Sequence, residues 1–165
     1  MIISRISILL SLFKSPKILF PNSSSKSIII FSESLIDEAR KDDKIVAEGS
    51  NKVTLNNDPT AHGEVVAIRQ ACKNINNFNL NGYELYSTCE PCPMCLSAIY
   101  WARIDKIYYA NTRDDAQKID FDDSLIYSEL LKNVKKRKIP MVQIMRDEAS
   151  KAFELWDKKT DKVKY

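Results

Sequence analysis

The 165-residue sequence is poor in histidine, glycine and long apolar runs. It has one histidine and three glycines, and its net charge is only +3. The apolar run over residues 6–13 is interrupted by serines and is far shorter than the ~20 apolar residues of a membrane span. A charge this small does not by itself argue for nucleic-acid binding. The length predicts a single globular domain. The short apolar run predicts a soluble protein without a membrane segment, and the small net charge disfavours nucleic acid as a partner.

The first 32 residues differ in composition from the rest. They contain nine serines and four Lys/Arg but no Asp or Glu. Such a start is typical of an organellar transit peptide, and it is also compatible with a disordered extension or a misplaced gene start. We assign 1–32 to a disordered or targeting extension and 33–165 to the globular domain. The expected location is the cytoplasm, or an organelle if 1–32 is a transit peptide.

Three of the four cysteines, Cys89, Cys92 and Cys95, fall within seven residues. A disulfide framework spreads its cysteines along the chain, whereas tight C-x-x-C spacing indicates a metal or redox site in a reducing compartment. Cys72 stands apart in a predicted helix and is expected to be a core residue. The sequence therefore predicts a metal site rather than disulfides.

Predicted strands and helices alternate from residue 45 onward. The periodicity predicts strands over 45–48, 83–87, 106–110 and 139–145, and helices over 34–41, from near 62, over 93–103, 125–132 and 148–158. This alternation predicts an α/β layered sheet.

Two short patterns could assemble a catalytic metal site. His62 lies two residues before Glu64 at a predicted helix start, and Cys92 and Cys95 lie three apart at another. Helix starts favour thiolates, and the i, i+3 spacing directs both sulfurs to one side. Three such ligands leave a fourth zinc position open for water, as hydrolytic zinc sites require. Glu64 fits a proton carrier between the attacking water and a leaving amine.

A closed structural zinc site is the alternative use of the same residues, with Cys89 as the fourth ligand. That arrangement would leave Glu64 without a role. Cys89 also falls at the end of a predicted strand, away from the helix that carries Cys92 and Cys95. The open site is therefore the favoured interpretation.

The pattern H-x-E followed by P-C-x-x-C is the signature of zinc deaminases. Longer stretches resemble bacterial-type guanine deaminases of the cytidine deaminase superfamily, and the resemblance covers about residues 44–165. The matching stretches are 57–73, 85–103, 121–130 and a tail with Ile139-Pro140, Phe153, Trp156 and Tyr165. The first two stretches are shared more loosely with tRNA adenosine deaminases.

This resemblance implies a three-layer α/β/α fold around a five-stranded mixed sheet. It implies one zinc ion per subunit on His62, Cys92 and Cys95, with Glu64 as proton shuttle. The implied reaction converts guanine and water to xanthine and ammonia. The implied assembly is a homodimer in which the C-terminal segments are exchanged.

The resemblance also implies the contacts to the base. Asn51, Gly63 and Asp123 would bind guanine, with Asp123 also counted as catalytic, Trp101 would line the pocket, and Tyr165 would close the pocket of the partner. Three of these residues have a second interpretation. Asn51 is compatible with a turn, Asp123 with a helix N-cap, and Trp101 with the core.

The N-terminal part of the sequence departs from the family pattern. The helix at 34–41 runs almost directly into Lys44–Gly49, so the usual first strand and its loop are missing. Either Ile28–Phe31 supplies a substitute strand, or the chain is a truncated member without activity, because losing a central strand leaves backbone groups unpaired.

Guanosine deamination remains a close functional alternative. The basic cluster 132–138 keeps tRNA adenosine deamination as another.

Overall fold

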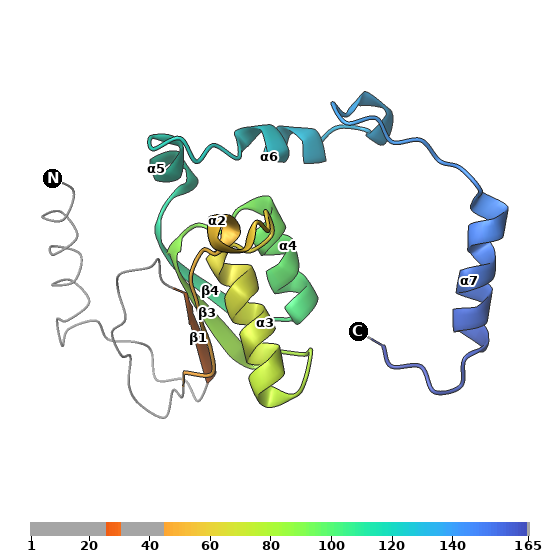
Figure 1. Ribbon diagram of the computed structural model, residues 1–165, viewed down its shortest axis with the longest axis horizontal. Coiled ribbons are helices and arrows are strands. Elements are labelled where there is room, and N and C mark those ends of the chain that lie inside the picture. Colours follow the sequence, from red (N-terminus) through yellow and green to blue (C-terminus); the bar gives the residue numbers. More distant parts are fainter. Residues whose placement is uncertain (1–25, 31–44, 165) are drawn as a thin grey trace, which may run out of the picture. The chain divides into compact units, whose positions relative to one another are not determined.

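The computed structural model of the protein describes residues 26–30 and 45–164. The chain divides into two compact units, Met1–Asn111 and Thr112–Tyr165, which are described separately below. The first unit contains the strands β1 (Lys26–Ile30), β2 (Glu48–Gly49), β3 (Tyr83–Cys89) and β4 (Lys106–Asn111), and the helices α2 (Val53–Asn56), α3 (Gly63–Ile75) and α4 (Pro93–Ala102) (Figure 1).

The sheet of the first unit has the strand order β2-β1-β3-β4, and every neighbouring pair is parallel. Of the two alternatives for the missing strand, the structure has the substitute strand, at Lys26–Ile30 instead of Ile28–Phe31; it pairs with both β2 and β3 and occupies a central position. This strand lies within 1–32, the segment predicted to be an extension. The predicted five-stranded mixed sheet is not found, because the part of the chain that is described forms four parallel strands.

The carboxyl ends of three strands meet at one edge of the sheet. Ile30 of β1 is paired with Gly49 of β2 on one side and with Ser87 of β3 on the other. The chain leaves β3 at this edge and enters α4 after three intervening residues. Loops at the carboxyl ends of parallel strands are where α/β sheets place their binding sites.

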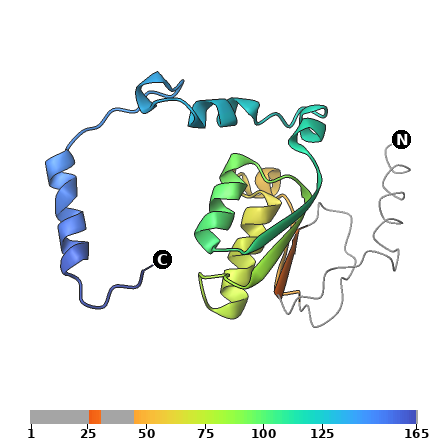
Figure 2. The same ribbon diagram turned by 180° about the vertical axis from the view of Figure 1, so that it is seen from behind.

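Both long helices of the first unit, α3 and α4, lie side by side on the same face of the sheet (Figure 1 and Figure 2). The core lies between these helices and the sheet, and it is formed by Ala47, Ala67, Ile68, Ala71, Leu80, Tyr83, Leu85, Ile99 and Ala102. Leu80 and Leu85 have no exposed surface. The predicted third layer is not found in the first unit as described, and the predicted helix 34–41 lies outside the described residues.

Gly49 allows β2 to approach α3 unusually closely. A Cβ atom at this position would lie 2.3 Å from the carbonyl oxygen of Gly63 and 2.6 Å from the backbone nitrogen of Ala67. Both atoms belong to helix backbone, which cannot rotate away as a side chain can. A side chain at position 49 would therefore push α3 away from the sheet at the end where His62 and Glu64 lie.

The second unit contains α5 (Arg113–Gln117), α6 (Ser124–Leu130), a 3-10 turn η1 (Val134–Lys136) and α7 (Arg146–Lys158). The predicted strand at 139–145 is wrong, since residues 137–145 form no helix or strand. A strand needs a neighbour to accept its backbone hydrogen bonds, and no strand is found between residues 112 and 164. No residue in that range is buried. Among the described residues, no helix is long and apolar enough to cross a membrane.

Candidate metal centre

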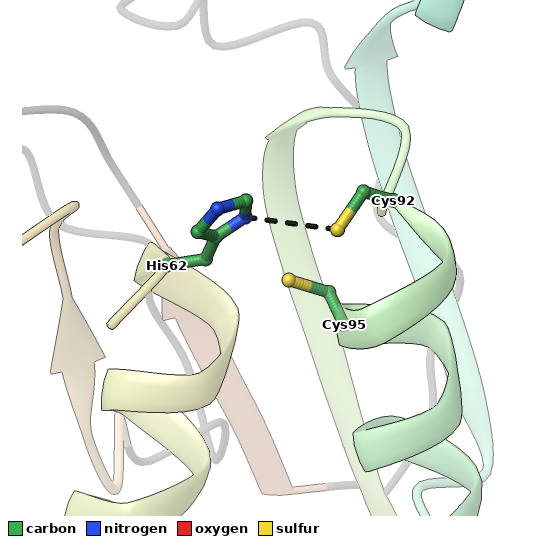
Figure 3. Close-up of side chains that lie close together, drawn as sticks. All are labelled: His62, Cys92 and Cys95. Carbon is green, nitrogen blue, oxygen red and sulfur yellow. Dashed lines mark hydrogen bonds between the residues drawn. The ribbon is translucent and has the colours of Figure 1, made fainter. Parts of the chain in front are cut away.

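The starts of α3 and α4 bring the predicted metal ligands together. His62 occupies the N-cap position of α3 and Cys92 that of α4, and both have extended backbone conformations. Neither side chain caps its own helix by a hydrogen bond. Pro93 follows Cys92 at the first helical position, where its fixed φ angle suits the helix and its missing N–H is not needed. The two side chains therefore face each other instead of their own helices (Figure 3).

The three side chains form one compact group. The Nδ1 atom of His62 lies 3.6 Å from the Sγ atom of Cys92. The possible ligand atoms of His62, Cys92 and Cys95 all lie within 4.8 Å of one another. Cys95 is fully buried, whereas His62 and Cys92 are half-buried.

This donor set fits zinc. Zinc–sulfur and zinc–nitrogen bonds of about 2.3 and 2.0 Å place tetrahedral ligand atoms about 3.5–3.8 Å apart. The separation of 3.6 Å between His62 and Cys92 agrees with that spacing. Two sulfurs and one imidazole are also the soft and borderline ligands that zinc prefers.

The closed site with Cys89 as a fourth ligand does not form. The group of possible ligands found among the described residues contains His62, Cys92 and Cys95 but not Cys89. Cys89 instead ends β3, where it is paired with Asn111 of β4. The Asn111 side chain donates a hydrogen bond to the carbonyl of Thr88, which braces the end of the strand. The arrangement is therefore a three-ligand site.

The two ligand thiols shift each other's pKa in opposite directions. A hydrogen bond from Cys95 lowers the pKa of Cys92 to about 6, against the opposing effect of its burial. The same hydrogen bond, together with burial and the nearby Glu64 carboxylate, raises the pKa of Cys95. Cys92 is therefore the thiol of the pair that loses its proton more readily. A metal ion that binds both sulfurs requires both thiols to be deprotonated.

Glu64 lies at the second position of α3, directly beside the ligand group. Its Oε2 atom lies 3.3 Å from the Sγ atom of Cys95, and its Oε1 atom lies 3.3 Å from the Oγ atom of Ser87. Its carboxylate thus lies next to the group of possible metal ligands without belonging to it. This is the position that a proton carrier for hydrolysis needs.

Ser87 was not singled out from the sequence. It lies on β3, two residues after Leu85 and four after Tyr83, and all three residues are buried. The alternation of a strand places such residues on one face. A polar residue in this series is the feature that could have identified it.

The structure describes the surroundings of three residues that are predicted to contact the base. The Oδ1 atom of Asn51 accepts a hydrogen bond from the backbone N–H of Val53, 3.0 Å away, so Asn51 forms a turn at the start of α2. Gly63 is buried in the first turn of α3. Trp101 is 66% exposed on α4, so its interpretation as a core residue is wrong.

Asp123 and Tyr165 belong to the second unit. Asp123 occupies the N-cap position of α6, but its side chain makes no capping hydrogen bond. Its backbone carbonyl accepts hydrogen bonds from Ile126 and Tyr127, which starts the helix. Tyr165 lies outside the described residues. The contacts of Asn51, Gly63, Trp101, Asp123 and Tyr165 with a base remain predictions.

The fold and the three-ligand site define a zinc-dependent hydrolytic deaminase. Residues 39–111 match the family of cytidine and deoxycytidylate deaminase zinc-binding regions. The chain is 49% identical over 125 residues to the guanine deaminase of Bacillus subtilis, covering 76% of this chain and 80% of that protein. The chain belongs to the cytidine and deoxycytidylate deaminase family and is a homologue of its guanine deaminases.

Two further comparisons agree with this assignment. The crystal structure of guanine deaminase from Bacillus subtilis superimposes with a TM-score of 0.73 at 48% identity, covering 76% of this chain and 80% of that one. A tRNA-specific adenosine deaminase of Buchnera aphidicola is 36% identical over 110 residues, covering 66% of this chain and 70% of that protein. Both the identity and the matched length are greater for the guanine deaminase.

Proposed function

We propose that the protein hydrolyses guanine to xanthine and ammonia. The observation that carries this proposal is the group of His62, Cys92 and Cys95 with the Glu64 carboxylate beside it. The 49% identity to a guanine deaminase supports guanine as the base. In the reaction, the oxygen of water adds to the ring carbon that carries the exocyclic amine. The bond between that carbon and the amine nitrogen then breaks.

Different residues of the chain bind the metal ion and transfer protons. His62, Cys92 and Cys95 would hold one zinc ion, which when bound supplies the Lewis acidity that makes water a nucleophile near neutral pH. Glu64 takes a proton from the attacking water and delivers protons to a ring nitrogen and to the leaving amine. The two cysteine ligands need a reducing compartment, so we place the protein in the cytoplasm.

The remaining predicted residues would hold the base. Asp123 would accept hydrogen bonds from the N–H groups at the far edge of guanine, and Asn51 can both donate and accept. The Oδ1 atom of Asn51 accepts a hydrogen bond from the N–H of Val53, and its amide N–H groups could donate to a ligand. Trp101 offers an exposed aromatic face on α4, and the backbone of Gly63 lies at the helix start beside His62.

We infer that the second unit packs against a second copy of the chain, with Tyr165 closing the partner's pocket. No residue from 112 to 164 is buried, although the unit has several large apolar side chains. On α7, Ala149, Ala152, Phe153 and Trp156 follow the spacing of one helix face, and Phe153 is 79% exposed. An apolar face of this kind is a feature of surfaces that associate.

Ammonia release from zinc-loaded protein tests the reaction. We expect release from guanine, with little from guanosine, adenine or cytosine, and no inosine formation in tRNA. The variant Glu64→Gln removes the proton carrier and should lower the rate by ~10²-fold or more, with its zinc content unchanged. Activity on guanosine alone would assign the nucleoside as substrate. An unchanged rate in Glu64→Gln would show that the measured activity came from another source.

Light scattering during gel filtration tests the assembly. We expect a molar mass about twice the 18.9 kDa of one chain. The variant Phe153→Glu should shift the protein to the mass of a monomer, because it puts a charge on the apolar face of α7. Lys151→Glu is the matched control, since it places the same side chain at an exposed position of the same helix. A monomeric wild-type protein would refute the inferred exchange.

A further inference from the structure

We propose that Ser87 is a positioning residue for Glu64, holding the carboxylate in the orientation that proton transfer needs. This inference rests on the proposed function. The inference concerns the orientation of the Glu64 carboxylate, whereas the proposed function concerns the reaction in which Glu64 transfers protons. The residue belongs to neither half of the metal-binding signature.

The geometry of Ser87 restricts what its hydroxyl can do. The side chain comes from β3, whereas Glu64 comes from α3, so their hydrogen bond joins the sheet to the helix that carries the proton carrier. Ser87 is only 9% exposed, and its Oγ atom lies 3.3 Å from the Oε1 atom of Glu64. Water therefore has little access with which to replace this contact.

The direction of the hydrogen bond is set by Glu64, because an ionised carboxylate can only accept and Ser87 must therefore donate. The backbone N–H of Cys89 donates to the Oγ atom of Ser87 over 3.4 Å. A hydroxyl has one hydrogen to donate and two lone pairs to accept with. The N–H of Cys89 occupies one lone pair of the Ser87 hydroxyl, and the hydroxyl hydrogen is donated to Glu64. A short chain thus runs from Cys89 through Ser87 to the carboxylate.

Metal binding increases the importance of Ser87. Two side-chain contacts are described for the Glu64 carboxylate, one with Ser87 and the other with Cys95. The sulfur of Cys95 is a metal ligand in the proposed function, so it is committed to coordination when zinc is bound. Ser87 is then the described side-chain donor that remains for Glu64, and it engages Oε1 while leaving Oε2 directed toward the ligand group.

The surrounding sheet keeps Ser87 in place. Its backbone is paired with Ile30 of the central strand β1, and the strand end beyond it is tied to β4 through Asn111. A side chain on a paired strand varies less in position than one on a loop, which suits it to orienting a catalytic group.

Steady-state kinetics on zinc-loaded full-length protein test the proposal. In Ser87→Ala we expect kcat to fall by about 10- to 100-fold, the range for loss of a hydrogen bond to a charged group, with KM changed less than twofold. Ser87→Thr keeps a hydroxyl on a strand-compatible side chain and should restore kcat to within threefold of wild type. Ser97→Ala is the matched control, since the hydrogen bond described for the Ser97 hydroxyl goes to the carbonyl of Pro93 within its own helix.

A double-mutant cycle separates positioning from a general structural effect. In the Glu64→Gln background, Ser87→Ala should cost less than twofold, because the carboxylate that Ser87 orients is gone. An equal fall in both backgrounds, or an unchanged kcat in the single variant, would overturn the proposal. A wild-type protein that binds zinc but does not act on guanine would refute the proposed function instead.

A crystal structure of the zinc-loaded wild type gives a readout that does not depend on activity. We expect the Ser87 hydroxyl to remain within hydrogen-bond distance of Glu64, and the Glu64 carboxylate to move or become disordered in zinc-loaded Ser87→Ala. Separation of the two side chains in the wild type would overturn the proposal. So would an unmoved Glu64 in the variant.

Discussion

Replacing Gly49 with alanine tests how tightly the metal site depends on the contact between β2 and α3. The added Cβ atom would lie 2.3 Å from the Gly63 carbonyl oxygen, 2.6 Å from the Ala67 nitrogen and 2.9 Å from the Ala67 Cβ atom. Contacts this short are repulsive, and two of the three partners are helix backbone. The helix must therefore move away from the strand.

The expected cost follows from the nature of these contacts. Inserting a methyl group into a well-packed region costs about 1–3 kcal/mol, and we expect the upper part of that range because the neighbouring atoms are backbone. For a chain of this length each kcal/mol lowers Tm by about 2–4 °C, so Gly49→Ala should melt about 6–12 °C below wild type. The displaced end of α3 carries His62, so zinc affinity should fall by about tenfold or more.

Gly82→Ala is the matched control for the same chemical change. Gly82 has a φ angle of +83°, but nothing lies within 4 Å of the position of its Cβ atom. The backbone strain of an alanine there costs about 1–2 kcal/mol. Thermal melts followed by circular dichroism, with zinc affinity from competition with a chromogenic chelator, measure both variants. If Gly49→Ala melts within 2 °C of wild type and binds zinc equally well, the close packing of β2 on α3 does not set the site.

Other predictions concern thiol chemistry, the core and a surface cap. In metal-free protein at pH 7.5, a thiol reagent should label Cys92 first, because a hydrogen bond with Cys95 lowers the pKa of Cys92 to about 6. Zinc should abolish this labelling. Cys92 reacting no faster than the other thiols would contradict the prediction. Leu85→Ala should lower the free energy of unfolding by about 2–5 kcal/mol in chemical denaturation, since the side chain is fully buried. The hydrogen bond from Lys118 lowers the pKa of Asp115, so the ionised carboxylate stabilises the folded protein. Asp115→Asn should therefore have a lower Tm than wild type at pH values above the ordinary carboxyl pKa. The difference in Tm between variant and wild type should disappear as the pH falls through the lowered pKa of Asp115.

The metal site could be predicted from the sequence because its spacing is local. Cys92 and Cys95 lie on one turn of helix, and His62 and Glu64 lie at the start of another. Helix starts are set by nearby residues such as Pro93, so both halves of the site are encoded within a few positions. Only the approach of the two helices to each other depends on the tertiary fold, and the family resemblance made that fold predictable.

The sheet was harder to predict because strand pairing joins distant segments. The apolar residues before Phe31 indicated a possible strand, but nothing in the sequence fixed its register beside Glu48 and Tyr83. The segment 139–145 has the composition of a strand, but residues 112–164 provide no strand to pair with it. Ser87 was missed for a similar reason, since its significance comes from the position of Glu64 across the core.

The central place of β1 in the sheet has a consequence for the order of assembly. Ile28 pairs with Leu85, which lies 57 positions further along the chain, while β3 and β4 are joined by α4 alone. Pairings between distant segments form slowly, because a long loop must close first. We therefore expect α3, β3, α4 and β4 to associate before β1 enters between β2 and β3. Until then β3 presents an open edge that can pair with another chain, so aggregation during refolding should rise with protein concentration.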